Sequence, residues 1–515
     1  MGLIIFLSCI TIPLLFYHQT LDDFFPKHIA QLIAIISNGN LVQTDVLVTQ
    51  IPGFYTLGSV ISLVCGLPPE SLMYLPIQLI PYSILLFFLL FRIGGNVILA
   101  GCVTLIDLSS GVTGTGKIFF WPHGIGSILF FLILILVLGF LQNNQRREFL
   151  ILTIVTGASL VFLSYNLTAM TLFLLVIVGV LSGSLYYFLL RFELKNQVYL
   201  NIARQVLISA VIIACVEFGL SKFAYGSFLP TLRATENLDL TSLDKFSVSF
   251  VDPNLTDAIL SPIMVHYPIS ITIISLLKYG ILAITILLYG FVVTKKFFHE
   301  LKIDYIDILL LSLISMEIFY AVPRLLIGGA IATLVWIPGI LCLIRLTGVS
   351  KKYRIMSVVV IGGLLILTLS SYAIFTLGGD IDRISYDNDG YKESNQWFNQ
   401  YAGSALFCSD ELTRNFMILY DIQTALTEKK GDLDFTMVAE QSPLLRAAEA
   451  AVLTNLQAGE LNKRWYYVLN NRLSKINLDN WITLQSWRRS ESLVDANDKI
   501  NKIYDNSLLA VYPPI

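Results

Sequence analysis

Long apolar segments separated by short polar loops make up most of the sequence. Ten such segments follow residue 70, most of them close to the roughly 20 residues that a helix needs to cross a bilayer; they are 71–92, 95–110, 118–141, 148–165, 168–190, 203–222, 268–294, 305–324, 328–348 and 353–377. Another apolar segment, residues 2–17, lacks the basic start and the cleavage site of a signal peptide, so it is expected to be an uncleaved first helix. The pattern predicts an α-helical polytopic membrane protein with about eleven transmembrane helices.

The apolar segment at residues 51–67 fits two interpretations, because prolines bound it and glycines interrupt it. Basic residues in alternate short loops mark those loops as cytoplasmic; they are Arg92, Arg146, Arg147, Arg191, Lys195, Arg204, Lys295, Lys296, Lys302, Arg345, Lys351, Lys352 and Arg354. With a cytoplasmic N-terminus this alternation requires that 51–67 does not cross. Residues 18–70 are therefore predicted to form one external loop with two helices at the membrane surface. As an ordinary span, 51–67 would instead place Asp22 and Asp23 in the cytoplasm.

Residues 379–515 differ from the rest of the chain, because they are rich in charge and contain no apolar run of spanning length. Their pattern predicts helices and strands: helices at 391–401 and 443–458, a buried strand at 405–408, and a hairpin formed by 502–504 and 509–512. On the predicted topology this part lies outside the cell. The sequence thus predicts a transmembrane domain at 1–378 and a small extracytoplasmic α/β domain at 379–515.

Composition restricts the class of protein and its partners. Hydrophobic residues make up 55% of the chain and charged residues 14%, against about 25% charged residues in soluble domains. A formal net charge of −2 argues against a nucleic-acid partner. The six cysteines are scattered and have neither disulfide nor metal-site spacing. We therefore expect a multi-pass protein of the cell membrane, with the lipid bilayer as a partner and with no cofactor.

Two adjacent carboxylates, Asp22 and Asp23, follow the first apolar segment directly. Residues 29–36 after them are predicted to form a helix in the membrane interface, which Asn38-Gly39-Asn40 ends. An acidic pair held at such a depth does little for stability, because charge is costly near hydrocarbon. It can, however, place a general base beside a lipid-linked substrate. Only one of the two side chains can face a given cavity, since neighbouring side chains point in different directions.

Other polar residues lie at the predicted outer ends of the spans and outline a cavity open to the exterior: Asp107, His123, Asn166, Lys222 and His266. Glu317, Tyr320 and Arg324 share one face of another span, because spacings of three, four and seven residues fall on the same side of a helix. Arg324 could hold a phosphate through its forked guanidinium. Equally, it could extend to the interface or pair with Glu317.

The acidic pair, the two interfacial helices, about eleven spans and an external C-terminal domain together resemble the GT-C superfamily of integral-membrane glycosyltransferases. Residues 50–57, followed by Cys65-Gly66-Leu67, are similar to the second interfacial helix of the protein mannosyltransferase and aminoarabinose transferase branches. Residues 393–398 and 502–506 resemble segments common in prokaryotic, especially archaeal, members. The resemblance implies a donor in which a polyprenyl phosphate or diphosphate carries the sugar.

The sequence departs from the oligosaccharyltransferase branch of this superfamily. That branch carries a Trp-Trp-Asp motif, whereas Trp397 is followed here by Phe398-Asn399. It also carries an external Asp-x-Asp metal site, whereas Asp107 has no acidic residue two positions on. Neither an oligosaccharyltransferase nor a bound metal is therefore expected.

The resulting hypothesis is sugar transfer from a polyprenyl-phosphate donor to a glycan, lipid or protein acceptor outside the cell, with inversion. Asp22 or Asp23 would deprotonate the acceptor, and the resemblance favours Asp22, because the superfamily usually places its catalytic aspartate first in the pair. The remaining candidates would bind substrate: Arg324, Lys222 and His266 at the phosphate, Asp107, His123 and Asn166 around the sugar, and Tyr320 beside Arg324.

Two other classes of function compete with this hypothesis. A transporter or flippase would use ionisable residues within the membrane, of which the spans contain Glu217, Lys278 and Glu317. The sequence shows neither symmetric halves nor paired interrupted helices, which many transporters have. A non-catalytic scaffold that presents residues 379–515 to a partner is the third class.

Overall fold

The computed structural model describes the helical part of the chain and a few C-terminal segments. The described residues are 25–39, 52–73, 77–110, 122–142, 146–191, 197–225, 269–300, 303–326 and 332–377, with 393–394, 396–397, 400–401, 406–409, 465–470, 504–505 and 509–512. The predicted first helix at 2–17 and the predicted helix at 443–458 lie outside them.

Each of the ten apolar segments after residue 70 contains one helix of the structure. These helices are α5 (Leu79–Gly94), α6 (Val97–Ser110), α7 (Pro122–Gln142), α8 (Arg147–Val161), α9 (Tyr165–Leu190), α10 (Gln197–Tyr225), α14 (Ile269–Glu300), α15 (Tyr305–Leu326), α16 (Ala332–Leu346) and α17 (Lys351–Leu377). The first of them starts later than its apolar segment. A short 3₁₀-helix, η1 (Pro69–Met73), comes before it, and Pro76 between the two cannot donate the backbone hydrogen bond of a continuous helix.

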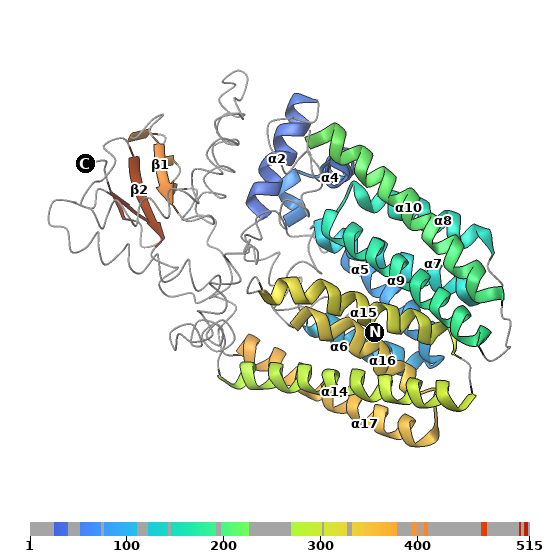
Figure 1. The fold of residues 1–515 in the computed structure, drawn as a ribbon. Helices are drawn as coiled ribbons and strands as arrows, with labels where there is room; N and C mark the ends of the chain where they lie inside the picture. The colour runs from blue at the N-terminus through green and yellow to red at the C-terminus, as the bar shows by residue number, and fades with distance from the viewer. Residues whose placement is uncertain are drawn as a thin grey trace.

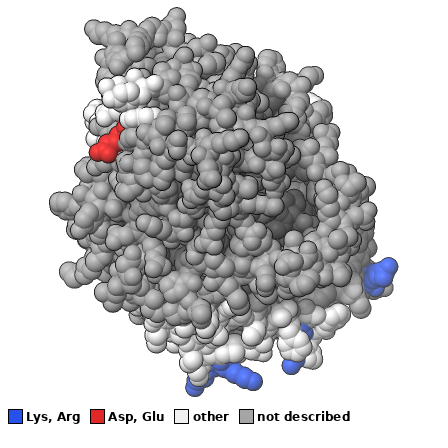
Figure 2. Space-filling model, turned by 90° about the vertical axis from the view of Figure 1, so that its left-hand side faces the viewer, with Lys and Arg blue, Asp and Glu red and all other residues white. Residues whose placement is uncertain are grey.

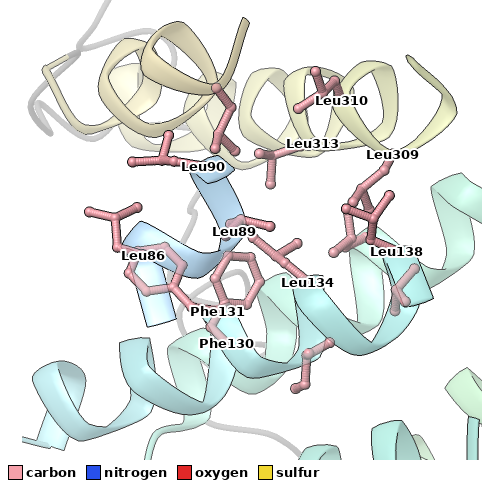
Figure 3. Close-up of a cluster of buried hydrophobic side chains, with 14 of the residues drawn as sticks. Leu86, Leu89, Leu90, Phe130, Phe131, Leu134, Leu138, Leu309, Leu310 and Leu313 are labelled. Carbon is pink, nitrogen blue, oxygen red and sulfur yellow. The ribbon is translucent and has the colours of Figure 1, made fainter. Parts of the chain in front are cut away.

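The helices lie side by side in a bundle (Figure 1). Its interior is built mainly of aliphatic side chains. In Figure 3, Leu89 of α5, Leu134 of α7 and Leu313 of α15 meet between the three helices, and each is at most 1% exposed. Large apolar side chains also cover the outside: Ile284, Leu287 and Phe291 of α14 are 63–73% exposed. A helix that is apolar on its inner and outer faces is typical of a membrane protein.

Five of the described helices are long and apolar enough to cross a membrane. They contain the spans Gly124–Gln142, Leu167–Leu190, Gln197–Gly219, Leu276–His299 and Lys351–Ser370. The protein is therefore a helical membrane protein, as the hydrophobic pattern predicts.

Basic residues gather at one end of this bundle, which we call the basic end. Arg92, at the close of α5, donates a hydrogen bond from Nε to Gln142 Oε1 of α7 over 3.1 Å. Lys296 of α14 and Arg345 of α16 both pair with Asp304, just before α15. In Figure 2, which faces the other end, the described Lys and Arg side chains show only at the margin of the outline. The loops predicted to be cytoplasmic thus share one end.

Two short helices lie at the end of the bundle opposite the basic end. They are α2 (Phe25–Asn38) and α4 (Pro52–Cys65), each of 14 residues. At 1.5 Å per residue each is about 21 Å long, which is less than the roughly 30 Å of a hydrocarbon core. They pack on one another and on η1. The predicted interfacial helix at 29–36 lies within α2.

A four-stranded sheet is described in the C-terminal part of the chain. Its strands are β1 (Leu406–Ser409), β2 (Trp465–Asn470), β3 (Tyr504–Asp505) and β4 (Leu509–Tyr512), in the order β1-β2-β4-β3. β1 and β2 are parallel, whereas β4 runs antiparallel to both β2 and β3. The predicted strand at 405–408 matches β1, and the predicted hairpin matches β3 and β4. The sheet lies outside the helical bundle, on the left in Figure 1.

Candidate functional site

The structure brings the backbone of most predicted site residues to the end opposite the basic end. His123 and Asn166 are the second residues of α7 and α9, and Lys222 lies in the last turn of α10. Tyr320 and Arg324 lie in the last two turns of α15. The side chains of these five residues are outside the described part of the structure, as are Asp22, Asp23 and His266 altogether.

Asp107 is the predicted site residue whose side chain is described. It is 0% exposed, and each carboxylate oxygen accepts a hydrogen bond from another helix. Trp336 Nε1 of α16 donates to Oδ1 over 2.6 Å, and the Tyr82 hydroxyl of α5 donates to Oδ2 over 2.9 Å. A buried carboxylate is tolerated only when it has such donors. Asp107 therefore ties α5, α6 and α16 together.

The turn between α5 and α6 explains why Tyr82 lies opposite Asp107. Gly95 has a positive φ of 68°, a conformation that glycine adopts without strain. Asn96 then caps α6, because its Oδ1 accepts hydrogen bonds from the backbone N–H groups of Ile98 and Leu99. This tight turn makes the two helices antiparallel, so residues at nearly the same distance from it, such as 82 and 107, lie at a similar level.

A buried lysine lies near the ring of Trp336, the residue that donates a hydrogen bond to Asp107. Lys278 of α14 is 6% exposed, and its Nζ lies 6.0 Å from the centroid of the Trp336 ring. The neighbouring Tyr279 packs edge-on against the same ring, with the centroids 6.0 Å apart. An ammonium group near the face of an indole is attracted by its π electrons. Asp107, Tyr82, Trp336, Lys278 and Tyr279 are together called the Asp107 cluster below.

The sequence pattern missed most of this cluster. Tyr82 and Trp336 appear in the sequence as ordinary apolar residues, and Lys278 as an isolated charge. All three residues lie about one to three turns from the helix ends that are opposite the basic end. This shared depth is the sequence signal that could have identified them as one cluster. Ionisable groups at such a depth are uncommon and usually functional.

A buried histidine joins the two short helices. His28 Nδ1 of α2 lies 2.8 Å from the Tyr55 hydroxyl of α4, and the two residues are 6% and 0% exposed. The His28 ring also packs edge-on against Phe54, with centroids 5.4 Å apart. The contact lies five residues after Asp23. This contact therefore fixes the orientation of α2 on α4.

The start of α4 is attached to the bundle through Gly53. Its backbone N–H donates to the carbonyl oxygen of Phe162, at the close of α8, over 2.9 Å. A Cβ on residue 53 would lie 2.9 Å from both Cβ and the carbonyl oxygen of Phe162, so only glycine fits there. The other side of α4 presents Leu57, Val60, Leu63 and Val64, which are 38–80% exposed. α4 is thus held at its start and exposes an apolar surface along its length.

Within the described residues no three His, Cys, Asp or Glu side chains lie close enough together to hold a metal ion. The buried polar side chains described at the end opposite the basic end include the carboxylate of Asp107, the ammonium of Lys278, the imidazole of His28 and the phenol of Tyr82. These groups suit proton transfer and the binding of a charged substrate.

No family model matches the chain, and no curated protein is significantly similar to it.

Proposed function

We propose that the protein is a membrane glycosyltransferase that moves a sugar from a polyprenyl-phosphate donor to an acceptor at the outer membrane surface. The observation that carries the proposal is the attachment of α2, which begins two residues after Asp23. His28 binds it to α4, and Gly53 binds α4 to the end of α8. In this proposal the fixed helix holds the acidic pair that precedes it in the sequence at the membrane surface, as a general base requires.

The proposed reaction is a single displacement at the anomeric carbon of the donor. Asp22 or Asp23 takes the proton of the acceptor hydroxyl, whose oxygen forms a bond to that carbon. The bond from the carbon to the phosphate oxygen breaks, and both its electrons leave with the polyprenyl phosphate. Attack opposite the leaving group inverts the configuration. Arg324, with Lys222 and His266, would stabilise the negative charge that grows on the phosphate.

Other residues of the same end have supporting roles in this proposal. His123, Asn166 and Tyr320 contact the sugar or the phosphate. Asp107, whose two oxygens are already bonded, acts as a positioning residue that holds α6 against α5 and α16. Its cluster also supplies the ammonium of Lys278, a further cation in addition to Arg324, Lys222 and His266, which were predicted from the sequence.

The exposed apolar side of α4 suits the long hydrocarbon tail of the donor. A short helix with one apolar face lies in the interface with that face in the acyl region. The polyprenyl chain would lie along α4 while its phosphate reaches the polar ends of α7, α9 and α15. The topology belongs to this proposal: about eleven spans, a cytoplasmic N-terminus, an extracytoplasmic C-terminal α/β domain and residence in the cell membrane.

Reconstitution tests the proposal directly. Purified protein in liposomes is supplied with radiolabelled sugars on polyprenyl phosphate, with a mixture of lipid and glycan acceptors outside the vesicles. We expect label in an acceptor together with release of polyprenyl phosphate. The matching nucleotide sugars serve as the control donor and should transfer nothing. Transfer from the nucleotide sugar alone would contradict the donor class, and transfer from no donor would contradict the enzyme class.

A transporter or flippase is the second candidate, and the buried ionisable residues of the spans favour it. Lys278 and Glu317 are 6% and 7% exposed, at depths where ion paths in transporters are built. The same liposomes separate the two functions. A flippase would move labelled polyprenyl-phosphate sugar between leaflets without breaking the sugar–phosphate bond.

A further inference from the structure

The interface between α9 and α10 has a well-defined register. The two helices are antiparallel, and two glycines of α9 mark which residues of α10 lie beside them. A Cβ at Gly179 would lie 2.6 Å from Leu207 Cγ, and one at Gly183 would lie 3.8 Å from Ala203 Cβ. Continued along the helices, this register places Thr171 within two residues, about 3 Å, of the level of Glu217.

Both residues are buried. Thr171 is 0% exposed and Glu217 is 7% exposed. Glu217 follows Ile213 by one helical turn, and Ile213 packs against Gly157 of α8. Glu217 therefore lies on the side of α10 that faces α8, inside a segment that is long and apolar enough to cross the membrane.

Each residue has a buried polar atom without a hydrogen-bond partner among the described residues. These atoms are Glu217 Oε2 and Thr171 Oγ1. Other hydroxyl groups nearby are satisfied: Thr168 Oγ1 donates to the carbonyl of Ser164 over 2.9 Å. Neither atom therefore has a described group with which it shares a proton.

No described group on the surrounding helices can neutralise a Glu217 carboxylate. Residues 149–161 of α8 and 165–190 of α9 contain no Asp, Glu, Lys, Arg or His. The nearest cation in the sequence of α10 is Lys222, five residues on, which is about 140° around the helix. The exposed Cys215 is two residues away and on another face. An unpaired carboxylate there would be costly, and a carboxyl group avoids the cost by keeping its proton.

We propose that Glu217, at the level of the buried Thr171 hydroxyl on the neighbouring helix, is a proton-binding site within the membrane and carries a proton at neutral pH. The site is separate from Asp22 and Asp23, and the proposal does not depend on glycosyl transfer. Its ligand is a proton.

A hydrophobic carbodiimide tests this protonation directly. The reagent takes the proton of a carboxylic acid onto one nitrogen, and the carboxylate oxygen adds to its central carbon to give an O-acylisourea. Migration of the acyl group to nitrogen then gives a stable N-acylurea with no other reactant. An ionised carboxylate brings no proton to the reagent, so a carboxyl in hydrocarbon labels only if it is protonated.

The experiment treats the full chain in liposomes with dicyclohexylcarbodiimide at pH 7 and maps the adduct by mass spectrometry. We expect the adduct on Glu217 and not on Glu148, which is exposed at the start of α8. Both glutamates are in the same molecule, so misfolding of a variant does not enter the comparison. Labelling of Glu148 but not Glu217, or equal labelling of both, would overturn the proposal.

A second measurement uses Glu217→Gln, which resembles the protonated acid in shape and lacks charge. At about pH 4, close to the pKa of a glutamate in an unfolded chain, its melting temperature should equal that of the wild type. Between about pH 4 and pH 8 the wild type should fall below the variant, because the unfolded chain releases this proton from about pH 4 while the fold retains it to higher pH. Parallel pH curves for the two proteins would show that Glu217 carries no proton that the fold retains.

Discussion

A buried polar side chain is tolerated in the bundle when other helices supply its hydrogen-bond partners, as they do for Asp107. The sequence identifies Asp107 as a candidate, but its donors are 25 and 229 residues away in the chain. Neither donor has a pattern that separates it from an apolar lining residue. Such a pairing depends on how the helices pack against one another. The pattern of residues along one helix does not show this packing.

At this scale the Asp107 cluster gives a prediction about stability. Tyr82→Phe removes one donor from a fully buried carboxylate and should lower the free energy of unfolding by about 1–3 kcal/mol, the cost of an unsatisfied buried group. Thermal melting in detergent measures it. Tyr187→Phe is the matched control, because Tyr187 is 67% exposed. Equal melting temperatures for the two variants would show that the Tyr82 hydrogen bond is unimportant.

Asp304, in the loop before α15, gives a prediction about pH. Burial alone would raise its pKa, but hydrogen bonds and charges from Lys296 and Arg345 outweigh burial, so the pKa is lowered. A lowered pKa means that the stabilisation is present above the unfolded pKa of about 4 and is lost as the pH falls through the folded value. Asp304→Asn should therefore lose less stability than the wild type when the pH is lowered from 6 to 3. Identical pH profiles would exclude this contribution.

The positions of the helices along the chain are the part of the fold that the sequence predicts best. All ten apolar segments after residue 70 contain a helix, because long apolar runs have few other stable structures. The short α2 and α4 also fall where interfacial helices were expected. Their contacts were not foreseen: the His28–Tyr55 pair and the Gly53–Phe162 hydrogen bond join segments that have no common pattern.

The attachment of α4 predicts a specific sensitivity at residue 53. Gly53→Ala places a methyl group 2.9 Å from Phe162 Cβ, a contact that forces α4 away from α8. Overpacking of this kind costs about 1–3 kcal/mol. Melting temperature and sugar transfer should both fall. Gly101→Ala in α6 is the control, since its Cβ would have no atom within 4 Å. If Gly53→Ala behaves like the control, α4 is not held through this contact.

The whole molecule has two chemically different ends, and this polarity follows largely from the sequence. Alternating basic loops predict one common side, and the structure joins them there through Arg92–Gln142 and Lys296–Asp304–Arg345. The basic residues thus lie together at one end of the described bundle. From the rule that basic loops remain in the cytoplasm, we propose that the opposite end faces outward.

Cysteine labelling tests that orientation. In a cysteine-free background, Asn40→Cys and Ser385→Cys should react with an impermeant maleimide added to intact cells. Asn144→Cys, in the loop between α7 and α8, should react only after permeabilisation. Labelling of positions 40 and 144 from the same side would contradict the topology and remove the basis for an external active site.

The central claim is that the acidic pair before α2 contains the catalytic base. Its most direct test compares Asp22→Asn, Asp23→Asn and the control Asp304→Asn in the liposome transfer assay, with melting temperatures measured on the same samples. Loss of a positioned general base removes roughly 10²–10⁴-fold of the rate, whereas loss of a helix cap costs only about 1 kcal/mol of stability. We predict that one of the first two variants, Asp22→Asn by preference, loses transfer at least 100-fold with an unchanged melting temperature, while Asp304→Asn keeps its activity. Full transfer activity in both Asp22→Asn and Asp23→Asn would contradict the claim.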